Sequence, residues 1–308
     1  MFRVIKSIYM DFSVIIPNFN GAKFLSDCLK SLLAAAKHCP GTNLEIILSD
    51  NASTDNSLTV FKKYSHNFIV HRTNLGFGEA VNHAALLATK PYLLVTNNDL
   101  KLDLHWFEKI TKAINLYPKA ACYYGLVLNK TGDLIESEGF KYFSSGRCKN
   151  INNGLLYRHS RESGNLYKKI WGAPASLIVY RRSVFEKLGG FDSRFFAYIE
   201  DVDFSFRLHY QGFVTMYIPQ AISYHLGGAT SNKMGNLRAY MTLRNWLFFL
   251  KKNYSPKQII LNLPAIFLER LKNLKYFLVS TPAKLWLSQI RTLWIDLLNF
   301  DHLYDHRH

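Results

Sequence analysis

Strand-like and helix-like segments alternate along the first part of this 308-residue chain. Short apolar runs with the length of buried strands lie at residues 12–17, 44–49, 68–71 and 92–96. Segments whose apolar residues recur at helical spacing lie between and after them, at residues 23–37, 55–64, 77–88 and 103–117. Because parallel strands need a crossover connection, usually a helix, this order predicts an α/β fold with a mostly parallel sheet covered on both faces.

The second part of the chain continues this pattern after a polar stretch at residues 132–169, which is either a flap or an insertion and in which we expect loops at 150–154 and 157–165. The elements expected to complete the domain are a strand at 176–180, helices at 182–188 and 200–210, and strands at 214–218 and 221–225. From about residue 237 the pattern changes to long amphipathic helices. We therefore predict an α/β domain at 1–236 and a C-terminal helical segment at 237–308.

Polar residues follow four of the predicted strands. The four segments are Pro17–Asn20, Asp50–Asp55, Arg72–Gly78 and Asn97–Asp99. One such ending is ordinary, because Asn and Asp favour turns and helix caps. Four endings at the same edge of a sheet, where sheets of this class bind their ligands, predict a polar binding site.

Three carboxylates, Glu200, Asp201 and Asp203, lie within four residues of an otherwise aromatic segment. Burying a carboxylate is costly, so each requires a cation, a capping role or a chemical role. The helix dipole favours acids in a first turn, which accounts for one of them. Asp203 has the i, i+4 spacing of an ion pair with Arg207 on a helix surface. A carboxylate at the enclosed start of this helix is suited to taking a proton from a sugar hydroxyl.

Three further signals have two interpretations each when taken alone. Gly76 and Gly78 form either a turn before a helix or a close backbone approach to a phosphate or ribose. Asp99 follows a strand and forms either an Asx turn or an oxygen ligand of Mg²⁺ or Mn²⁺. His225 ends an apolar strand beside two glycines and is either a hydrogen-bonded buried histidine or a metal ligand.

The formal net charge of +16 favours an anionic partner, which is a nucleic acid, a phosphorylated small molecule or an anionic membrane surface. Nucleic acid is the least favoured, because no recognised nucleic-acid motif is present and much of the charge lies in the tail. The four cysteines have no paired spacing, and we expect them to be reduced in a cytoplasmic protein. We expect neither a signal peptide nor a membrane span.

Together these segments resemble the inverting nucleotide-sugar glycosyltransferases of family 2, especially the rhamnosyltransferase-like bacterial members that build surface polysaccharides. The matching segments are SVIIPNFNGAKFLSDCLKSLL (13–33), SDNASTDNS (49–57), NLGFGEAVN (74–82), LLVTNND (93–99), GGFDSRFFAYIEDVDFSFRLHYQGF (189–213) and YIPQAISYHLGG (217–228). They occur in family order. The resemblance implies a GT-A fold, which is a Rossmann-like α/β domain that binds a nucleoside-diphosphate sugar and a divalent cation.

The resemblance also implies roles for individual residues around the donor. Residues expected to bind the nucleotide sugar are Pro17, Asn18, Asn20, Asp50, Asn74, Gly78, Asn97 and Asn98. Asp99 matches the last acid of the family's DxD-like element, and His225 matches a histidine near the metal and the diphosphate. These two residues would hold Mg²⁺ or Mn²⁺. Asn97 replaces the first acid of the element, which leaves open a catalytically impaired paralogue that only binds a nucleotide sugar.

For the reaction itself, the resemblance identifies Asp201 as the catalytic base. We expect Glu200 either to support this base from behind or to position the acceptor. The segment from Trp171 and Gly172 to Pro174 either lines the acceptor side or is a plain turn into a strand. The implied reaction is a single displacement that moves a sugar, with rhamnose favoured by the resemblance alone, from a dTDP- or UDP-linked donor. The acceptor would be a saccharide or a lipid-linked saccharide.

The tail combines basic residues with aromatic ones, including Trp246, Phe248, Phe249, Trp286 and Trp294. This composition is typical of amphipathic helices that lie on an anionic bilayer, and it would place the protein at the inner face of the cytoplasmic membrane. The alternatives are a helical cap packed on the catalytic domain and a homodimer interface.

Overall fold

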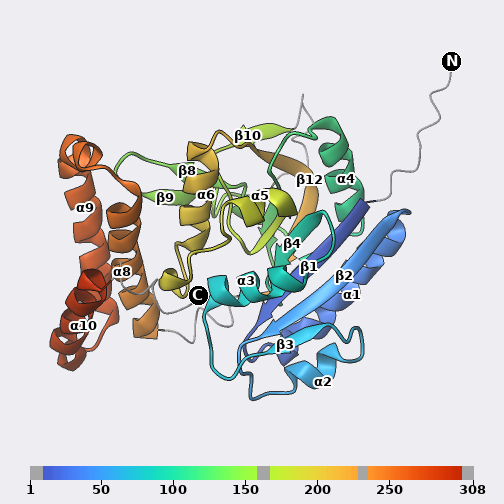
Figure 1. Ribbon diagram of the computed structural model, residues 1–308, viewed down its shortest axis with the longest axis horizontal. Coiled ribbons are helices and arrows are strands. Elements are labelled where there is room, and N and C mark those ends of the chain that lie inside the picture. Colours follow the sequence, from blue (N-terminus) through green and yellow to red (C-terminus); the bar gives the residue numbers. More distant parts are fainter. Residues whose placement is uncertain (1–9, 158–166, 228–234, 300–308) are drawn as a thin grey trace.

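The computed structural model describes residues 10–157, 167–227 and 235–299, with a ten-stranded mixed sheet at its centre (Figure 1). The main strand order is β10-β12-β6-β11-β4-β1-β2-β3, with β5 paired to β12 and β7 paired to β6. The strands are β1 (Met10–Asn18), β2 (Thr42–Asp50), β3 (Phe68–Val70), β4 (Tyr92–Thr96), β5 (Leu100–Leu102), β6 (Cys122–Asn129), β7 (Ile135–Ser137), β10 (Lys168–Ile170), β11 (Leu177–Arg181) and β12 (Thr215–His225).

The predicted parallel pairing is confirmed for the first four strands, β1 to β4. β1 pairs in parallel with both β2 and β4, and β2 pairs in parallel with β3. β11 runs antiparallel between β4 and β6. As a result, the carboxyl ends of β1, β2 and β4 lie at one edge of the sheet, and the polar segments that follow them are brought together there.

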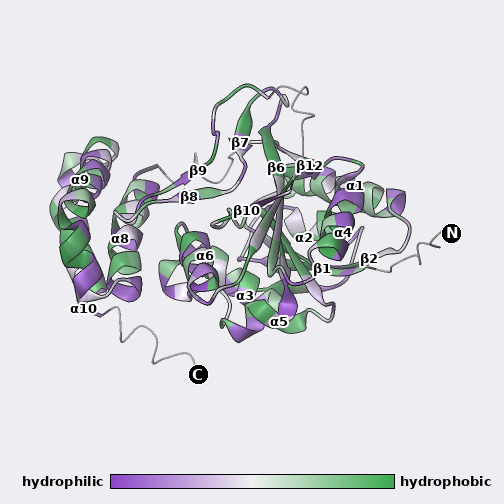
Figure 2. Ribbon diagram, turned by 90° about the horizontal axis from the view of Figure 1, so that it is seen from above, coloured by the Kyte–Doolittle hydropathy of each residue, from purple (hydrophilic) through white to green (hydrophobic). Residues whose placement is uncertain are grey.

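Helices cover both faces of the sheet, so that the hydrophobic strands are enclosed between them (Figure 2). α1 (Ala22–His38) and α4 (Trp106–Leu116) lie on one face, whereas α3 (Phe77–Leu87), α5 (Arg182–Lys187) and α6 (Glu200–Tyr210) lie on the other. α2 (Ser57–Phe61) is a short helix beside α1. The helical periodicity explains the packing, because α4 buries Phe107, Ile110 and Ile114 on one stripe.

The predicted elements differ from the structure mainly at their ends. The helix at 200–210 is confirmed, whereas the helix predicted at 55–64 shortens to α2. The two strands predicted at 214–218 and 221–225 are one strand, β12, with a register shift between Ile218 and Ile222. The polar stretch contains β7, β10 and a hairpin of β8 (Phe140–Tyr142) and β9 (Cys148–Asn150). Most of its loop predicted at 157–165 lies outside the described residues.

The tail forms three helices, α8 (Gly235–Asn253), α9 (Pro256–Ser280) and α10 (Trp286–Leu298), which lie beside α6 (Figure 1). Short 3₁₀ turns, η1 (Ser193–Phe195) and η2 (Ala283–Leu285), precede α6 and α10. Among the described residues, no helix is long and apolar enough to cross a membrane. All four cysteines are free.

α8 corrects one expectation about the tail. Trp246, Phe248 and Phe249, predicted as interfacial aromatics, are buried in a cluster with Phe195 and Val202 of the α/β domain. α8 is therefore packed as a cap on the catalytic domain. The division at residues 236 and 237 stays a prediction, and the two parts share this buried cluster.

Candidate active site

A pocket of about 310 Å³ lies at the carboxyl ends of β1 and β4 and at the start of α6. The sequence-predicted residues that line it are Pro17, Asn18, Asn74, Asn97, Asn98, Asp99, Glu200, Asp201 and His225. Residues far apart in the chain therefore meet in one pocket. Asn20, Asp50, Gly78, Trp171 and Gly172 are absent from its lining.

Asn18 is the centre of a hydrogen-bonded network at the end of β1. Its Nδ2 donates to Oδ1 of Asp50 at 2.8 Å and to Oγ of Ser53 at 3.0 Å, while its Oδ1 accepts a 2.6 Å hydrogen bond from Nδ2 of Asn98. Asn20 adopts a positive φ of 52° and accepts a hydrogen bond from the backbone N–H of Thr54. Asp50 and Asn20 thus stabilise the loops behind the pocket.

The glycine loop before α3 forms a second wall. Gly76 has a φ of 86°, and a Cβ at this position would lie 2.2 Å from the carbonyl oxygen of Phe196, so only glycine fits. Asn51, which lines the pocket and was not predicted, donates a 2.9 Å hydrogen bond to the carbonyl of Gly76. Its position directly after Asp50 was the available signal. Gly78 packs against Phe191 instead of facing the pocket.

Asp99 and His225 meet at the end of β4. Nε2 of His225 lies 3.2 Å from Oδ2 of Asp99, and Nδ1 of His225 lies 2.6 Å from Oε2 of Glu136. Burial lowers the pKa of His225, but its hydrogen bonds to Asp99 and Glu136 outweigh this and raise the pKa to about 10. Glu136, on β7, was not predicted, because nothing in the polar stretch distinguishes it.

The second carboxylate oxygen of Asp99 supports a cation site. Oδ1 of Asp99 is buried and has no hydrogen-bond partner within the described part of the chain. An unpaired buried carboxylate oxygen beside an imidazole is costly unless a ligand satisfies it. Carboxylate oxygen is a ligand of both Mg²⁺ and Mn²⁺, and a cation bound at Asp99 would displace the proton of His225, which frees an imidazole nitrogen to bind it. The residues present therefore fit a divalent cation.

The first two residues of α6, Glu200 and Asp201, line the pocket and have raised pKa values. Asp201 accepts hydrogen bonds from the backbone N–H groups of Ala175 at 3.3 Å and Val202 at 2.8 Å. Burial overcomes these bonds and raises the pKa of Asp201 to about 6. Burial and the neighbouring charge of Asp201 raise the pKa of Glu200 well above its usual value. Within the described residues, Oε2 of Glu200 has no partner.

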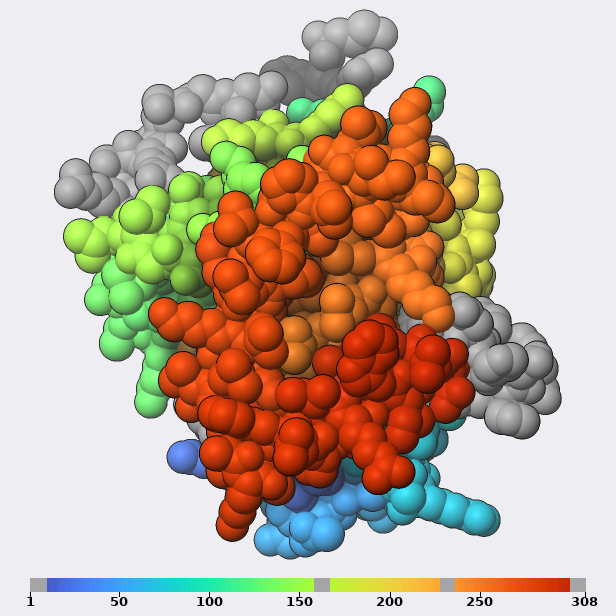
Figure 3. Space-filling view, turned by 90° about the vertical axis from the view of Figure 1, so that its left-hand side faces the viewer, coloured from blue at the N-terminus to red at the C-terminus, as the bar shows by residue number. Residues whose placement is uncertain are grey.

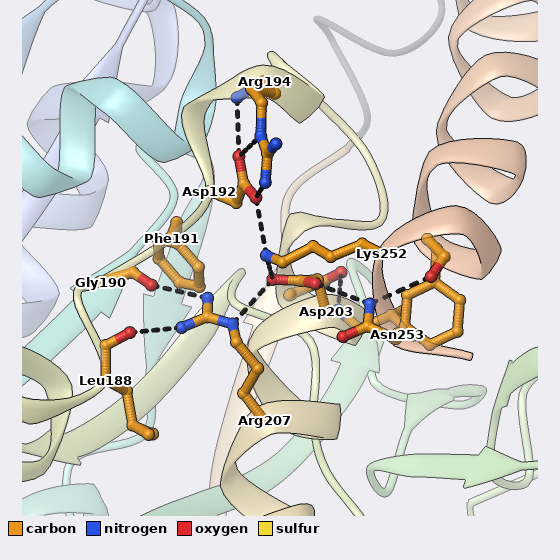
Figure 4. Close-up of polar contacts among 12 residues, drawn as sticks. Leu188, Gly190, Phe191, Asp192, Arg194, Asp203, Arg207, Lys252 and Asn253 are labelled. Carbon is orange, nitrogen blue, oxygen red and sulfur yellow. Dashed lines mark hydrogen bonds and ion pairs between the residues drawn. The ribbon is translucent and has the colours of Figure 1, made fainter. Parts of the chain in front are cut away.

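Asp203 points away from the pocket. The predicted ion pair with Arg207 is present at 2.9 Å, but the expectation of a surface position is wrong, because Asp203 has no exposed surface (Figure 4). Lys252 and Asn253 of α8 also contact this carboxylate, both at 2.9 Å. The pair of Asp203 and Arg207 is therefore enclosed by the tail, which the sequence pattern predicts as a separate segment.

The aromatic residues around α6 divide between the pocket and the core. Phe196 and Tyr198 line the pocket, whereas Phe195 is buried in the cluster under α8. Trp171 stacks on Tyr142 with ring centroids 4.3 Å apart. Gly172 faces Ser205 of α6, where a Cβ would lie 2.3 Å from the serine Cβ. Of the segment expected on the acceptor side, Pro174 lines the pocket, together with Ala175 and Ser176.

Known proteins share this sequence pattern and architecture. A family model described as Glycosyl transferase family 2 matches residues 13–189, and one described as Glycosyl transferase family group 2 matches residues 141–272. The chain is 26% identical over 227 residues to an N-acetylglucosaminyl-diphospho-decaprenol L-rhamnosyltransferase of Mycobacterium tuberculosis (strain CDC 1551 / Oshkosh), with 64% of this chain and 71% of the relative covered.

Two solved structures share the fold. One is the mannosyltransferase PcManGT from Pyrobaculum calidifontis in complex with GDP-Man and Mn²⁺, with a TM-score of 0.56, 15% identity, and coverage of 96% of this chain and 88% of that one. The other is GalNAc-T7 with UDP, GalNAc and Mn²⁺, with a TM-score of 0.58, 15% identity and coverage of 79% of this chain. The chain spans 48% of the length of GalNAc-T7.

These similarities confirm the predicted GT-A fold. The family model covers more than half of the chain, including the ends of β1, β2 and β4 that line the pocket. We conclude that the chain belongs to glycosyltransferase family 2.

Proposed function

We propose that this glycosyltransferase moves a sugar from a nucleoside-diphosphate donor to an acceptor hydroxyl with inversion at the anomeric carbon. The observation that carries the proposal is the position of Asp201, a partly buried carboxylate that lines the same pocket as Asp99 and His225. With a pKa of about 6, Asp201 is ionised at neutral pH and is more basic than an ordinary aspartate.

The donor would occupy the edge formed by β1, β2 and β4. Pro17, Asn18 and Asn74 would contact the base and ribose, with Asn51 beside them. Asn97 and Asn98 would lie near the diphosphate. Asn20, Asp50 and Gly78 would act by holding these loops in place. Solved neighbours that contain UDP or GDP-Man support a nucleotide-sugar donor, and we propose a dTDP- or UDP-linked sugar.

Asp99 and His225 would hold Mg²⁺ or Mn²⁺. A cation bound there would offset the negative charge that develops on the departing diphosphate. Glu136 hydrogen-bonds the far nitrogen of His225, so it fixes the orientation of the ring.

In the proposed displacement, Asp201 removes the proton from the acceptor hydroxyl. The acceptor oxygen forms a bond to the anomeric carbon while the bond between that carbon and the diphosphate oxygen breaks. Glu200, which lines the pocket beside Asp201, would hydrogen-bond a hydroxyl of a bound sugar. Phe196 and Tyr198 exclude water from the base. The acceptor would approach along Pro174–Ser176, with Trp171 and Gly172 behind this wall.

Product analysis tests the proposal directly. The purified chain is incubated with Mn²⁺ and separate dTDP-rhamnose, UDP-N-acetylglucosamine, UDP-galactose and GDP-mannose samples, with and without saccharide and lipid-linked saccharide acceptors. We expect one donor to release nucleoside diphosphate in an acceptor-dependent way, and the product to have the inverted anomeric configuration by NMR. Nucleotide binding without acceptor-dependent release would favour the impaired paralogue. The observation that supports this alternative is the replacement of the first acid by Asn97.

We also propose that α9 and α10 attach the enzyme to an anionic membrane surface, which would bring it to a lipid-linked acceptor at the inner face of the cytoplasmic membrane. These helices form the outer layer of one face of the molecule (Figure 3). Their exposed large apolar residues are Ile260, Leu261, Leu263, Phe267, Leu268, Leu271, Tyr276, Val279, Leu287, Trp294, Ile295 and Leu298. Exposed cations on the same two helices and their connection are Lys257, Lys272, Lys275, Lys284 and Arg291. An apolar surface with basic residues around it suits an anionic bilayer. It suits a second copy of this chain less well, because that copy would carry the same positive charge.

A further inference from the structure

The loop that leads into α6 has a strained backbone. Phe196, Tyr198 and Ile199 have φ angles of 63°, 68° and 74°, in the left-handed region that aromatic and β-branched residues rarely adopt. Ile199 is the residue immediately before α6, so its conformation sets the direction in which Glu200 and Asp201 leave the loop. Strain of this kind persists only where the surroundings hold it.

Every carbonyl of this loop has a donor. The carbonyl oxygens of Phe195, Ala197 and Tyr198 lie 2.9, 2.8 and 2.7 Å from Nδ2 of Asn245, a residue of α8 with no exposed surface. Nη2 of Arg244 donates to the carbonyls of Arg194 at 3.1 Å and Phe195 at 3.0 Å. The backbone N–H of Phe77 donates to the carbonyl of Phe196 at 2.6 Å.

The orientation of the Asn245 amide is fixed by its neighbour. Nε of Arg244 donates a 3.0 Å hydrogen bond to Oδ1 of Asn245, which leaves the Asn245 NH₂ group facing the loop. The NH₂ group presents only hydrogen-bond donors to the loop, and it therefore suits the three carbonyl oxygens that converge on it. A carboxylate at the same place would repel them.

We infer that Asn245 is a positioning residue, which holds the strained loop before α6 in its conformation and thereby places Asp201 at the pocket. The inference rests on the proposed role of Asp201 and goes beyond it, because the residue that sets the geometry of the base belongs to the tail. Without the three carbonyl contacts the loop relaxes toward unstrained backbone angles, and the start of α6 moves with it. A displacement of about 1 Å at a reacting group lowers turnover by about 100-fold.

The test compares Asn245→Asp with Asn253→Ala, a matched control. Aspartate keeps the shape of the asparagine side chain but has no N–H group to donate to the loop carbonyls. Asn253 lies on the same helix and donates to Oδ1 of Asp203 and the carbonyl of Phe249, so its loss also removes partly buried amide hydrogen bonds. Asn245→Ser serves if the aspartate variant does not fold. We expect the Asn245 variants to lower kcat by about 10- to 100-fold with the donor KM within about threefold of wild type.

Hydrogen exchange provides a readout that does not depend on the reaction. Peptides covering residues 194–203 should exchange at least about tenfold faster in the Asn245 variants, while peptides from α4 stay as in the wild type. Asn253→Ala should lower the melting temperature and leave kcat within about twofold. The inference is overturned if loop exchange in the Asn245 variants is unchanged, or if their kcat falls no more than that of Asn253→Ala at the same loss of melting temperature. If no donor is turned over by the wild type, the proposed function fails, and the exchange result still decides the role of Asn245 in the loop.

Discussion

Nζ of Lys252 lies 2.9 Å from Oδ2 of Asp203, a carboxylate with no exposed surface, and this contact joins α8 to α6 (Figure 4). The same ammonium group lies 2.6 Å from Oδ2 of Asp192. Burial opposes ionisation of Asp192, but the hydrogen bond of Arg194 and the charge of Lys252 hold its pKa well below the usual value. The tail therefore neutralises charge buried beside the catalytic helix.

Lys252→Met should lower the free energy of unfolding by about 2–4 kcal/mol, because two buried carboxylates lose a shared cation while each keeps an arginine. Urea unfolding followed by circular dichroism measures the change. Lys272→Met is the control, since Lys272 is 64% exposed and pairs with Glu269 at the surface. Its expected cost is below about 1 kcal/mol. Equal costs for the two variants would mean that the buried network adds no stability.

Asp201→Asn should keep donor binding and lower kcat by about 10²–10⁴-fold, the usual contribution of a general base. Donor binding is measured by calorimetry with the nucleotide sugar, and turnover by nucleoside-diphosphate release. In the wild type, kcat/KM should rise with pH and level off above about 6, because burial raises the pKa of Asp201 to about 6. A variant with nearly wild-type turnover would remove Asp201 from the mechanism.

The same raised pKa has a consequence for stability. Folded Asp201 binds a proton more tightly than unfolded aspartate, whose pKa is near 3.9, so this group lowers the stability of the fold as the pH rises from about 4 to about 6, and its effect is constant above that range. Asparagine carries no such charge. The melting temperature of Asp201→Asn minus that of the wild type should therefore increase between pH 5 and pH 8. A difference that stays constant over this range would show that the pKa of Asp201 is not raised.

The sequence allowed the α/β fold and most of the pocket to be predicted, for a physical reason. Asn18, Asn74 and Asp99 follow strands, and parallel strands bring their carboxyl ends to one edge whatever the details of packing. Glu136 and Asn245 could not be found in this way. Their roles depend on which segments pack against His225 and against the loop before α6, and no local periodicity encodes such long-range contacts.

The burial of Asp203 illustrates the same limit. The i, i+4 spacing to Arg207 predicts a pair but does not reveal its environment. The periodicity of α8 indicates an amphipathic helix without saying what it covers. Trp246, Phe248 and Phe249 have the composition of a membrane-facing stripe, and here they pack on the catalytic domain.

Asp99→Asn should weaken Mn²⁺ binding by removing the carboxylate whose Oδ1 has no partner in the described part of the chain. We expect the increase in melting temperature that Mn²⁺ gives the wild type to disappear in this variant. A surface group of His38, His105 and Glu108, with ligand atoms within 4.8 Å of one another, is a second place where Mn²⁺ could bind. His105→Ala controls for it and should keep the shift. Loss of the shift in His105→Ala alone would locate the ion at the surface.

The apolar face of α9 gives the last prediction. Phe267 and Leu271 lie one turn apart and are 63% and 49% exposed, so replacing both by aspartate adds negative charge where an anionic bilayer would contact the helix. In liposome flotation with phosphatidylglycerol vesicles, we expect the wild type to float and the double variant to stay in solution. Leu86→Asp changes an apolar residue on α3 that is 84% exposed, and it should float like the wild type. If the double variant floats equally well, or if its only effect is to dissociate a dimer in size-exclusion chromatography, this face binds no membrane.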